Sequence, residues 1–306
     1  MLYNGVKVEL TEIIKEEFEM KSRIESNATG DLNNEREIQK EYSDSLDQIA
    51  EGSAKTSDEN EVHSLLAGYK DEDGVTHMTF TNREMTGEDE EYINRADIRA
   101  NGAKVTTALL TRCVTSVGSL TRKSVGNPKA WEDIFKKMLS GDRDAILMQI
   151  RRDSMGDTIK VTHTCPNPDC KAKLQTEVSL DELEVKEFDG IREIPFDLPK
   201  GYTDKKGEVH KRGIMRRPNG LDSELLTPLA KNNLAKATTV LLTRLCSFED
   251  GTHIDDSVMA KLTTRDRQYL QELLNEHQFG VQLTVNVMCD RCGETFEGNL
   301  NQSNFM

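Results

Sequence analysis

The sequence predicts an α+β fold built as a tandem duplication of a hairpin–helices–zinc-knuckle-hairpin unit, preceded by an α-helical N-terminal extension. Three observations support this prediction: an internal repeat, the same order of strand and helix patterns in both copies, and a pair of cysteines near the end of each copy. The predicted segments are 1–61 for the acidic extension, 62–183 for the first repeat and 184–306 for the second.

The internal repeat consists of three matched blocks that occur in the same order. The first block aligns 68–89 with 201–222 at a constant offset of 133, and both versions open with Gly-Tyr. An apolar helical block and a Ser/Thr-x-Asp-Arg block follow at smaller offsets: 103–112 with 235–244, and 140–165 with 264–289. Self-similarity over about 100 residues is too long for a solenoid repeat and indicates a duplicated domain.

The first 60 residues have no counterpart in the second copy and carry more than half of the net charge of −14, with 15 acidic and 7 basic residues. Apolar side chains recur at helical spacing from Leu10 to Ile24 and again from Ile38 to Ile49, which predicts two amphipathic helices. Their apolar stripes are narrow, so the helices are expected to dock on the body or on another subunit.

The first repeat is expected to begin with a hairpin that includes strand 75–81, around a Gly-Tyr…Gly turn. A helix starts near Thr86, where a polar cap precedes acidic residues, and the 103–112 block forms the next helix. A further helix begins at Ser140 and is stopped by Gly156. Alternating strands then lead into and out of the cysteine turn: 158–164 and 173–178.

The sequence of the second repeat predicts the same order of elements as the first. Its elements are a hairpin strand at 209–215, helices that start near Asn219 and Thr264 on either side of the 235–244 helix, a stop at Gly280, and strands at 282–288 and 295–300.

Four of the six cysteines lie at hairpin turns, Cys165 and Cys170 in the first copy and Cys289 and Cys292 in the second. A tight turn that presents two thiolates to one point is typical of a zinc knuckle, and two knuckles provide a tetrahedral four-thiolate site. If the halves pack about a pseudo-two-fold axis, the knuckles share one structural zinc ion that clamps the halves together. Free thiols and disulfides within each hairpin remain the alternatives.

The remaining candidate metal ligands are assigned structural roles. Cys113 and Cys246 fall in the matched helices and are expected to be small buried apolar residues. His163 precedes Cys165 by two residues, but Val287 holds the matching position in the second copy. We therefore expect His163 to lie on the strand surface, and no catalytic zinc.

Composition and motifs exclude several classes of protein. No Walker loop, dinucleotide-binding signature, nucleophile elbow or His-Glu-x-x-His motif occurs, so we expect no enzymatic activity. No apolar run approaches the length of a membrane span, and residues 1–5 lack the features of a signal peptide. The expectation is a protein of a reducing cytoplasm with no membrane insertion.

Basic residues gather in the segment 200–217, where the first copy is acidic instead. They are Lys200, Lys205, Lys206, Lys211, Arg212, Arg216 and Arg217. A solvated hairpin face and a docking patch for an acidic neighbour are both open interpretations. An alternative function follows from the same residues: a zinc-ribbon adaptor that binds nucleic acid through 200–217. The acidic net charge and an aromatic content of 5% argue against nucleic acid as a partner.

A set of recurring motifs carries a family resemblance. In the first copy these residues are Arg83, Thr86, Gly87, Asp89, Glu90, Leu109, Leu110, Arg112, Asp142, Arg143, Gly156, Cys165, Pro166 and Cys170. In the second copy they are Arg216, Gly220, Asp222, Leu241, Leu242, Arg244, Asp266, Arg267, Gly280, Cys289 and Cys292. From about residue 62 to 306 the chain resembles the T4-type baseplate hub assembly proteins of contractile phage tails and related injection systems.

The resemblance implies a non-enzymatic structural or assembly protein at the hub of a tail baseplate, which works through protein–protein contacts. Its expected partners are other tail or baseplate proteins, with self-association as a further option. It would occupy the host cytoplasm during assembly and the tail baseplate of the virion. The extension at 1–60 departs from the family pattern and leaves open whether the protein is a chaperone or a permanent component.

Overall fold

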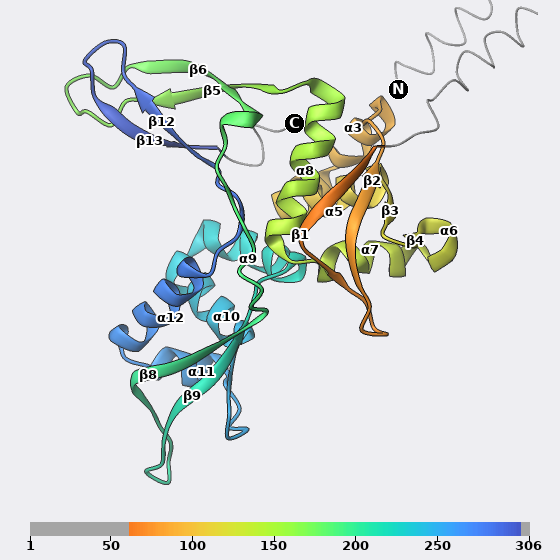
Figure 1. Ribbon diagram of the computed structural model, residues 1–306. Helices are drawn as coiled ribbons and strands as arrows, with labels where there is room; N and C mark the ends of the chain where they lie inside the picture. The colour runs from red at the N-terminus through yellow and green to blue at the C-terminus, as the bar shows by residue number, and fades with distance from the viewer. Residues whose placement is uncertain (1–60, 301–306) are drawn as a thin grey trace, which may run out of the picture. The chain divides into compact units, whose positions relative to one another are not determined.

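The protein is represented by a computed structural model that describes residues 61–300. The two helices predicted for residues 1–60 lie outside the described residues. Within the described part, the chain forms small antiparallel sheets and helices (Figure 1), which confirms the predicted α+β class.

The first sheet has four antiparallel strands in the order β1-β2-β3-β4. They are β1 (Val62–Lys70), β2 (Thr76–Asn82), β3 (Val114–Val117) and β4 (Leu120–Thr121). The predicted strand 75–81 thus falls on β2, and the turn before it is closed by Asp71, whose Oδ1 accepts the Val75 N–H at 2.8 Å. A bulge between Ser64 and Tyr69 bends the hairpin.

Helices pack beside this sheet around a core that includes Trp131 and Phe135, whose rings meet edge to face with centroids 5.3 Å apart. The helices are α3 (Gly87–Ile93), α4 (Ala96–Arg99), α5 (Gly102–Cys113), α6 (Arg122–Val125), α7 (Pro128–Lys137) and α8 (Ser140–Met155). Gly156 ends α8 with a φ of 82°, as predicted.

The second half has a three-stranded sheet in the order β10-β9-β8, from β8 (Glu193–Thr203), β9 (Val209–Arg216) and β10 (Cys246–Phe248). Its helices are α9 (Gly220–Asn232), α10 (Leu234–Leu245), α11 (Asp256–Lys261) and α12 (Thr264–Glu276). The prediction that Gly280 stops the last helix is wrong, because α12 ends at Glu276 and Gly280 begins a short strand.

Three two-stranded sheets complete the described chain. They pair β5 (Thr158–Thr164) with β6 (Lys173–Ser179), β12 (Thr284–Met288) with β13 (Thr295–Asn299), and β11 (Gly280–Val281) with β7 (Val185–Lys186). A 3-10 turn, Leu180–Glu182, follows β6. The strands predicted on either side of each cysteine pair are present, although the strand predicted from 282 begins at Thr284.

Buried aspartates hold the same contacts at matched positions of the two halves. Asp89 accepts hydrogen bonds from Arg83 and Arg112, and it forms a capping box with Thr86 at the start of α3. Asp222 accepts the corresponding bonds at the start of α9: from Arg216 at 2.7 Å and from Arg244 at 2.7 Å. Both aspartates are 0% exposed, so each ion pair fixes the start of a helix to the strand before it.

A second pair of aspartates connects a long helix to the first strand of each half. Asp142 Oδ1 accepts the backbone N–H groups of Leu66 and Ala67 at 2.6 and 3.0 Å. Asp266 Oδ1 accepts those of Lys200 and Gly201 at 2.7 and 3.4 Å. Each hairpin has a bulge at this point, so these backbone N–H groups are not paired with the neighbouring strand. The carboxylate accepts their hydrogen bonds instead.

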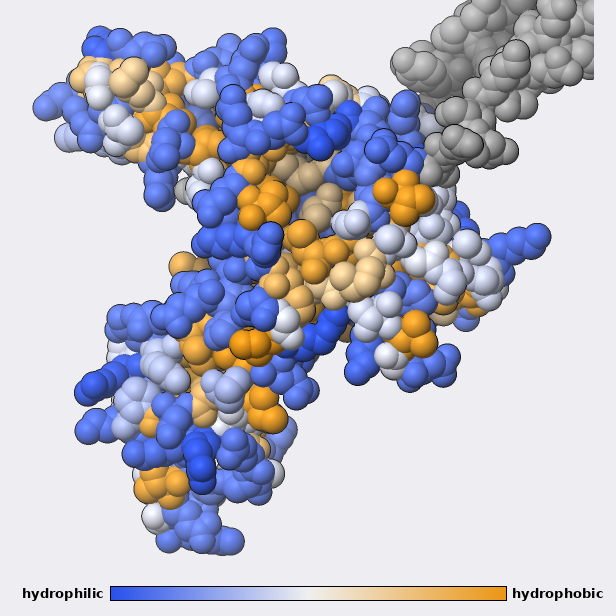
Figure 2. Space-filling model, viewed as in Figure 1, coloured by the Kyte–Doolittle hydropathy of each residue, from blue (hydrophilic) through white to orange (hydrophobic). Residues whose placement is uncertain are grey.

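The two halves meet where α8 and α9 begin. The Ser140 N–H donates to Pro218 O at 3.1 Å, the Gly220 N–H donates to Met138 O at 3.3 Å, and Leu139 forms a bridge with Asn219. The face drawn in Figure 2 is mostly hydrophilic, with apolar residues gathered near the middle of the described part. Backbone hydrogen bonds join the halves at this point, where a β-carbon on Gly220 would lie only 2.4 Å from Arg143 Nη1.

Candidate metal centre

The first cysteine pair is held by the turn between β5 and β6. The Cys165 N–H donates to Ala172 O at 2.9 Å, which closes the turn, and the Cys170 N–H donates to Asn167 O at 3.0 Å. Lys171 adopts a backbone φ of 45°, a value that residues other than glycine rarely take. These contacts turn both sulfur atoms toward the neighbouring hairpin.

The second pair is held by a shorter turn between β12 and β13. The Cys289 N–H donates to Glu294 O and the Gly293 N–H donates to Cys289 O, both at 2.8 Å. Gly293 has a φ of 75°, which lets the chain reverse directly after Cys292. The Cys-x-x-Cys-Gly pattern thus forms the knuckle turn that it predicts.

The structure brings all four predicted cysteines together. Their Sγ atoms lie within 4.8 Å of one another. The hairpins β5–β6 and β12–β13 lie side by side (Figure 1). Cys165 Sγ is 3.7 Å from Cys292 Sγ, and Cys170 Sγ is 3.8 Å from Cys289 Sγ, so each close pair joins the two hairpins. Thiolates at about 2.3 Å from a tetrahedral zinc ion are about 3.8 Å apart, so the donor set fits zinc.

Disulfides do not account for this cluster. A disulfide requires an S–S separation of about 2.05 Å, well below the observed distances, and all six cysteines are free. The close pairs also join different hairpins, whereas the disulfide alternative placed each bond within one hairpin. Cross-hairpin geometry is what a shared metal ion requires.

Burial differs across the cluster. Cys165 and Cys289 are buried beside Leu174 and Val287, whereas Cys292 is exposed. Burial raises the pKa of Cys165 to about 12. Burial also acts to raise the pKa of Cys289, but the backbone N–H groups of Cys292 and Arg291 outweigh it and bring the pKa to about 7. A metal ion would supply the positive charge that allows the Cys165 thiol to ionise.

The surface assignment of His163 is wrong. This residue is 7% exposed and packs edge to face against Phe296 at a centroid distance of 6.4 Å. A β-carbon on Gly298 of β13 would lie 2.5 Å from His163 Cε1, so the imidazole fills the space that this glycine leaves. His163 therefore belongs to the contact between the two hairpins, which no pattern within a single strand reveals.

Cys113 and Cys246 are buried in the helix–strand junctions, as predicted, with exposed fractions of 0% and 7%. Burial raises the pKa of Cys113 to about 11 and that of Cys246 to about 12. Both thiols stay protonated at neutral pH and behave as apolar groups.

The basic segment 200–217 divides into exposed and internal residues. Lys205 and Lys206 are exposed at the end of the β8–β9 hairpin. Arg216 is bonded to Asp222, and Arg217 is 3% exposed and donates to Asp189. Two of the seven cations therefore form ion pairs within the protein, which leaves fewer basic side chains for binding nucleic acid.

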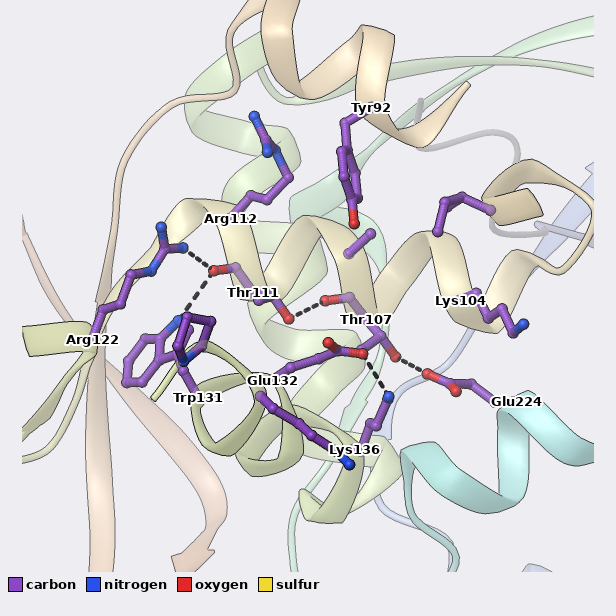
Figure 3. Close-up of a pocket in the computed structure, with 14 residues that line it drawn as sticks. Tyr92, Lys104, Thr107, Thr111, Arg112, Arg122, Trp131, Glu132, Lys136 and Glu224 are labelled. Carbon is purple, nitrogen blue, oxygen red and sulfur yellow. Dashed lines mark hydrogen bonds and ion pairs between the residues drawn. The ribbon is translucent and has the colours of Figure 1, made fainter. Parts of the chain in front are cut away.

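A separate cavity of about 520 Å³ lies among the helices (Figure 3). Its polar groups are largely paired with one another: Thr107 with Glu224, Lys136 with Glu132, and the Trp131 indole N–H with Thr111 O at 3.1 Å. No histidine or cysteine lines it. The polar groups that line this cavity are therefore satisfied mainly by one another.

Comparisons with known proteins give one family match. A model described as T4 bacteriophage base plate protein matches residues 77–205, a range that includes Cys165 and Cys170 but ends before Cys289. No curated protein and no solved structure matches the chain. Among the described helices, none is long and apolar enough to cross a membrane.

Proposed function

We propose that this chain is a non-enzymatic structural or assembly protein of a phage contractile-tail baseplate, in the hub region, and that it acts through contacts with other tail proteins. The observation that carries this proposal is the match of residues 77–205 to the T4 bacteriophage base plate protein family. In this proposal the protein occupies the host cytoplasm during assembly and, if it is a permanent component, the tail baseplate of the virion.

Duplication is part of this proposal. Segments 62–183 and 184–306 would be two copies of one unit. The support comes from contacts that recur at matched positions: the Asp89 and Asp222 ion pairs, and the Asp142 and Asp266 bonds to hairpin backbone. A body with two related faces can contact two similar neighbours, which suits a part located between subunits of a symmetric assembly.

The third part of the proposal is one structural zinc ion bound by Cys165, Cys170, Cys289 and Cys292. Sulfur separations of 3.7 and 3.8 Å support it. Four thiolates leave no open coordination position, so the ion would stabilise the pairing of the hairpins rather than activate a substrate. A rigid body of this kind fits a structural role.

The test is deletion of the gene from the genome that encodes it, followed by electron microscopy of the particles. Tails that lack baseplates, with assembly restored by the gene supplied in trans, are the expected result. Normal contractile tails in the deletion would overturn the proposal. Mass spectrometry of purified tails then separates a permanent component from an assembly factor, and salt-sensitive DNA binding by the purified chain would favour the adaptor alternative.

A further inference from the structure

The end of the β8–β9 hairpin holds a second cluster of metal-ligating side chains, far in sequence from the four cysteines. A ring nitrogen of His210 and one carboxylate oxygen each from Asp204 and Glu208 lie within 4.8 Å of one another. His210 Nε2 is 3.8 Å from Asp204 Oδ2, which is too long for a hydrogen bond. The three groups therefore face one point without bonding directly to each other.

His210 is buried, and one of its two ring nitrogens makes no hydrogen bond. The side chain is 8% exposed, and Nε2 has no hydrogen-bond partner among the described residues. The other nitrogen, Nδ1, lies 2.6 Å from Asp250 Oδ2. A histidine that ligates a metal through one nitrogen commonly donates its other N–H to a carboxylate, which fixes the tautomer and aims the free nitrogen at the ion.

Backbone contacts hold the two carboxylates in place. Asp204 Oδ1 accepts the N–H groups of Lys206 and Glu208, at 2.8 and 2.9 Å, so Oδ2 stays directed toward His210. The Asp204 N–H donates to Glu208 O at 2.9 Å and closes the turn. Glu208 is exposed, so its side chain can move the short distance inward that coordination requires.

The first half of the chain provides an internal comparison. At the matched positions, Asp71 Oδ2 bonds directly to His77 Nε2 at 3.0 Å. Val75 stands where Glu208 is. Beside Nδ1 of His77 lies Gly118, where a β-carbon would be 2.5 Å away, so no carboxylate of the described residues takes the part that Asp250 has at His210. The two imidazoles are otherwise placed alike, each stacked on a tyrosine: Tyr69 at 6.3 Å and Tyr202 at 6.0 Å. Of the two histidines, only His210 has two additional carboxylates nearby, from Glu208 in the hairpin and from Asp250 after β10, and only its Nε2 is left unpaired.

We propose that Asp204, Glu208 and His210 form a second divalent-metal site, for Zn²⁺ or a similar transition-metal ion, with Asp250 as the residue that positions His210. Imidazole and carboxylate ligands suit zinc, and three protein ligands leave a fourth position open to water or to a group from another molecule. The ligands of such a site are about 3.3 Å apart, so the cluster has to contract on binding. Lys205 and Lys206 lie in the same turn and weaken the attraction for a cation.

The experiment uses the full chain with the cysteine site already filled by one equivalent of zinc. Equilibrium dialysis against excess Zn²⁺, with metal content measured by mass spectrometry, should give a second equivalent. Glu208→Gln is expected to weaken this second equivalent by roughly tenfold or more, and Asp250→Asn to weaken it by roughly tenfold. His210→Gln should abolish it.

The matched controls come from the first hairpin and from spectroscopy. His77→Gln removes the corresponding imidazole and should leave the second equivalent unchanged. Co²⁺ bound at the second site should lack the thiolate charge-transfer absorption that the cysteine site gives. No second equivalent in the unaltered chain would overturn the proposal. So would a second equivalent that persists in both Glu208→Gln and His210→Gln. Because Glu208 is exposed, its variant keeps the test valid even if the buried His210 cannot be replaced.

Discussion

Gly220 lies so close to Arg143 that a β-carbon on the glycine would be 2.4 Å from Nη1 and 2.6 Å from Cζ of the guanidinium group. Arg143 is 3% exposed, donates to Phe135 O and bonds to Thr107 Oγ1 at 3.0 Å. The first helix of the second half therefore begins directly against a buried cation of the first half.

This contact predicts different effects for one substitution at matched positions. Gly220→Ala should lower the free energy of unfolding by about 1–3 kcal/mol, because the buried guanidinium has to shift. Gly87→Ala is the control, since no atom lies within 4 Å of a β-carbon there. Urea unfolding followed by the fluorescence of Trp131, the single tryptophan, measures both. Equal stability of the two variants would contradict the contact.

Removal of a buried carboxylate charge should be strongly destabilising. Asp89→Asn removes the charge that accepts hydrogen bonds from Arg83 and Arg112, whose side chains are 38% and 29% exposed, and the loss of these charge-assisted bonds should lower the free energy of unfolding by about 1.5–3 kcal/mol. Asp222→Asn should have a similar effect. The exposed Arg95–Asp97 pair is the control: Asp97→Asn should change stability by less than about 1 kcal/mol. Chemical denaturation of the three variants tests the ranking.

The same two aspartates predict that the stability of the protein depends on pH in the acidic range. Burial acts to raise the pKa of Asp89, but hydrogen bonds from Arg83, the Thr86 backbone and Arg112 outweigh it and hold the pKa well below its usual range. The pKa of Asp222 is lowered in the same way, against its burial, by Arg216 and Arg244. Their stabilisation is therefore full above the unfolded-state pKa of about 3.9 and is lost as the pH falls toward the folded-state values.

Unfolding free energies measured at several pH values below about 4 test this predicted direction of the pH dependence. Stability should fall as the solution becomes more acidic, and it should fall less steeply in Asp89→Asn, which has lost one of the two groups. An Asp89→Asn variant with an unchanged acid slope would show that other carboxylates dominate the titration.

A single exposed ligand allows the cysteine cluster to be tested without disturbing the core. Cys292→Ser should abolish tight zinc binding and lower the melting temperature, since Cys292 is exposed and serine fits the turn. Cys113→Ala, outside the cluster, should keep its zinc. Metal analysis and calorimetry measure both effects. A full equivalent of tightly bound zinc in the serine variant would contradict a four-thiolate site.

The sequence predicts elements whose signals are local. The hairpins, the helices at 87–93 and 102–113 and both cysteine turns follow from alternation, caps and turn residues within a few positions. Helix α7 had such a signal as well, with an Asn127 cap before Pro128 and apolar residues at Trp131, Ile134 and Phe135. The internal repeat does not predict this helix, because the second copy is shorter in this region.

Features that depend on distant partners could not be predicted. The burial of His163 depends on Gly298, and the fit of Gly220 depends on Arg143. The role of Asp89 could be predicted only in part. Its position at a helix start is a local signal, whereas its bond to Arg112 depends on a separate helix. Pairing of the four cysteines was predictable only because the repeat suggested a symmetric arrangement.

The spacing of the sulfur pairs has a consequence for synthesis of the chain. The partners are 119 and 127 residues apart. At a typical translation speed the ribosome needs roughly 10 s to make that length of chain. During this interval Cys165 and Cys170 are already synthesised, but the two cysteines that would complete the metal site with them are not. Folding of the nascent protein is thus tied to how the growing polypeptide is protected from oxidation until its second hairpin emerges.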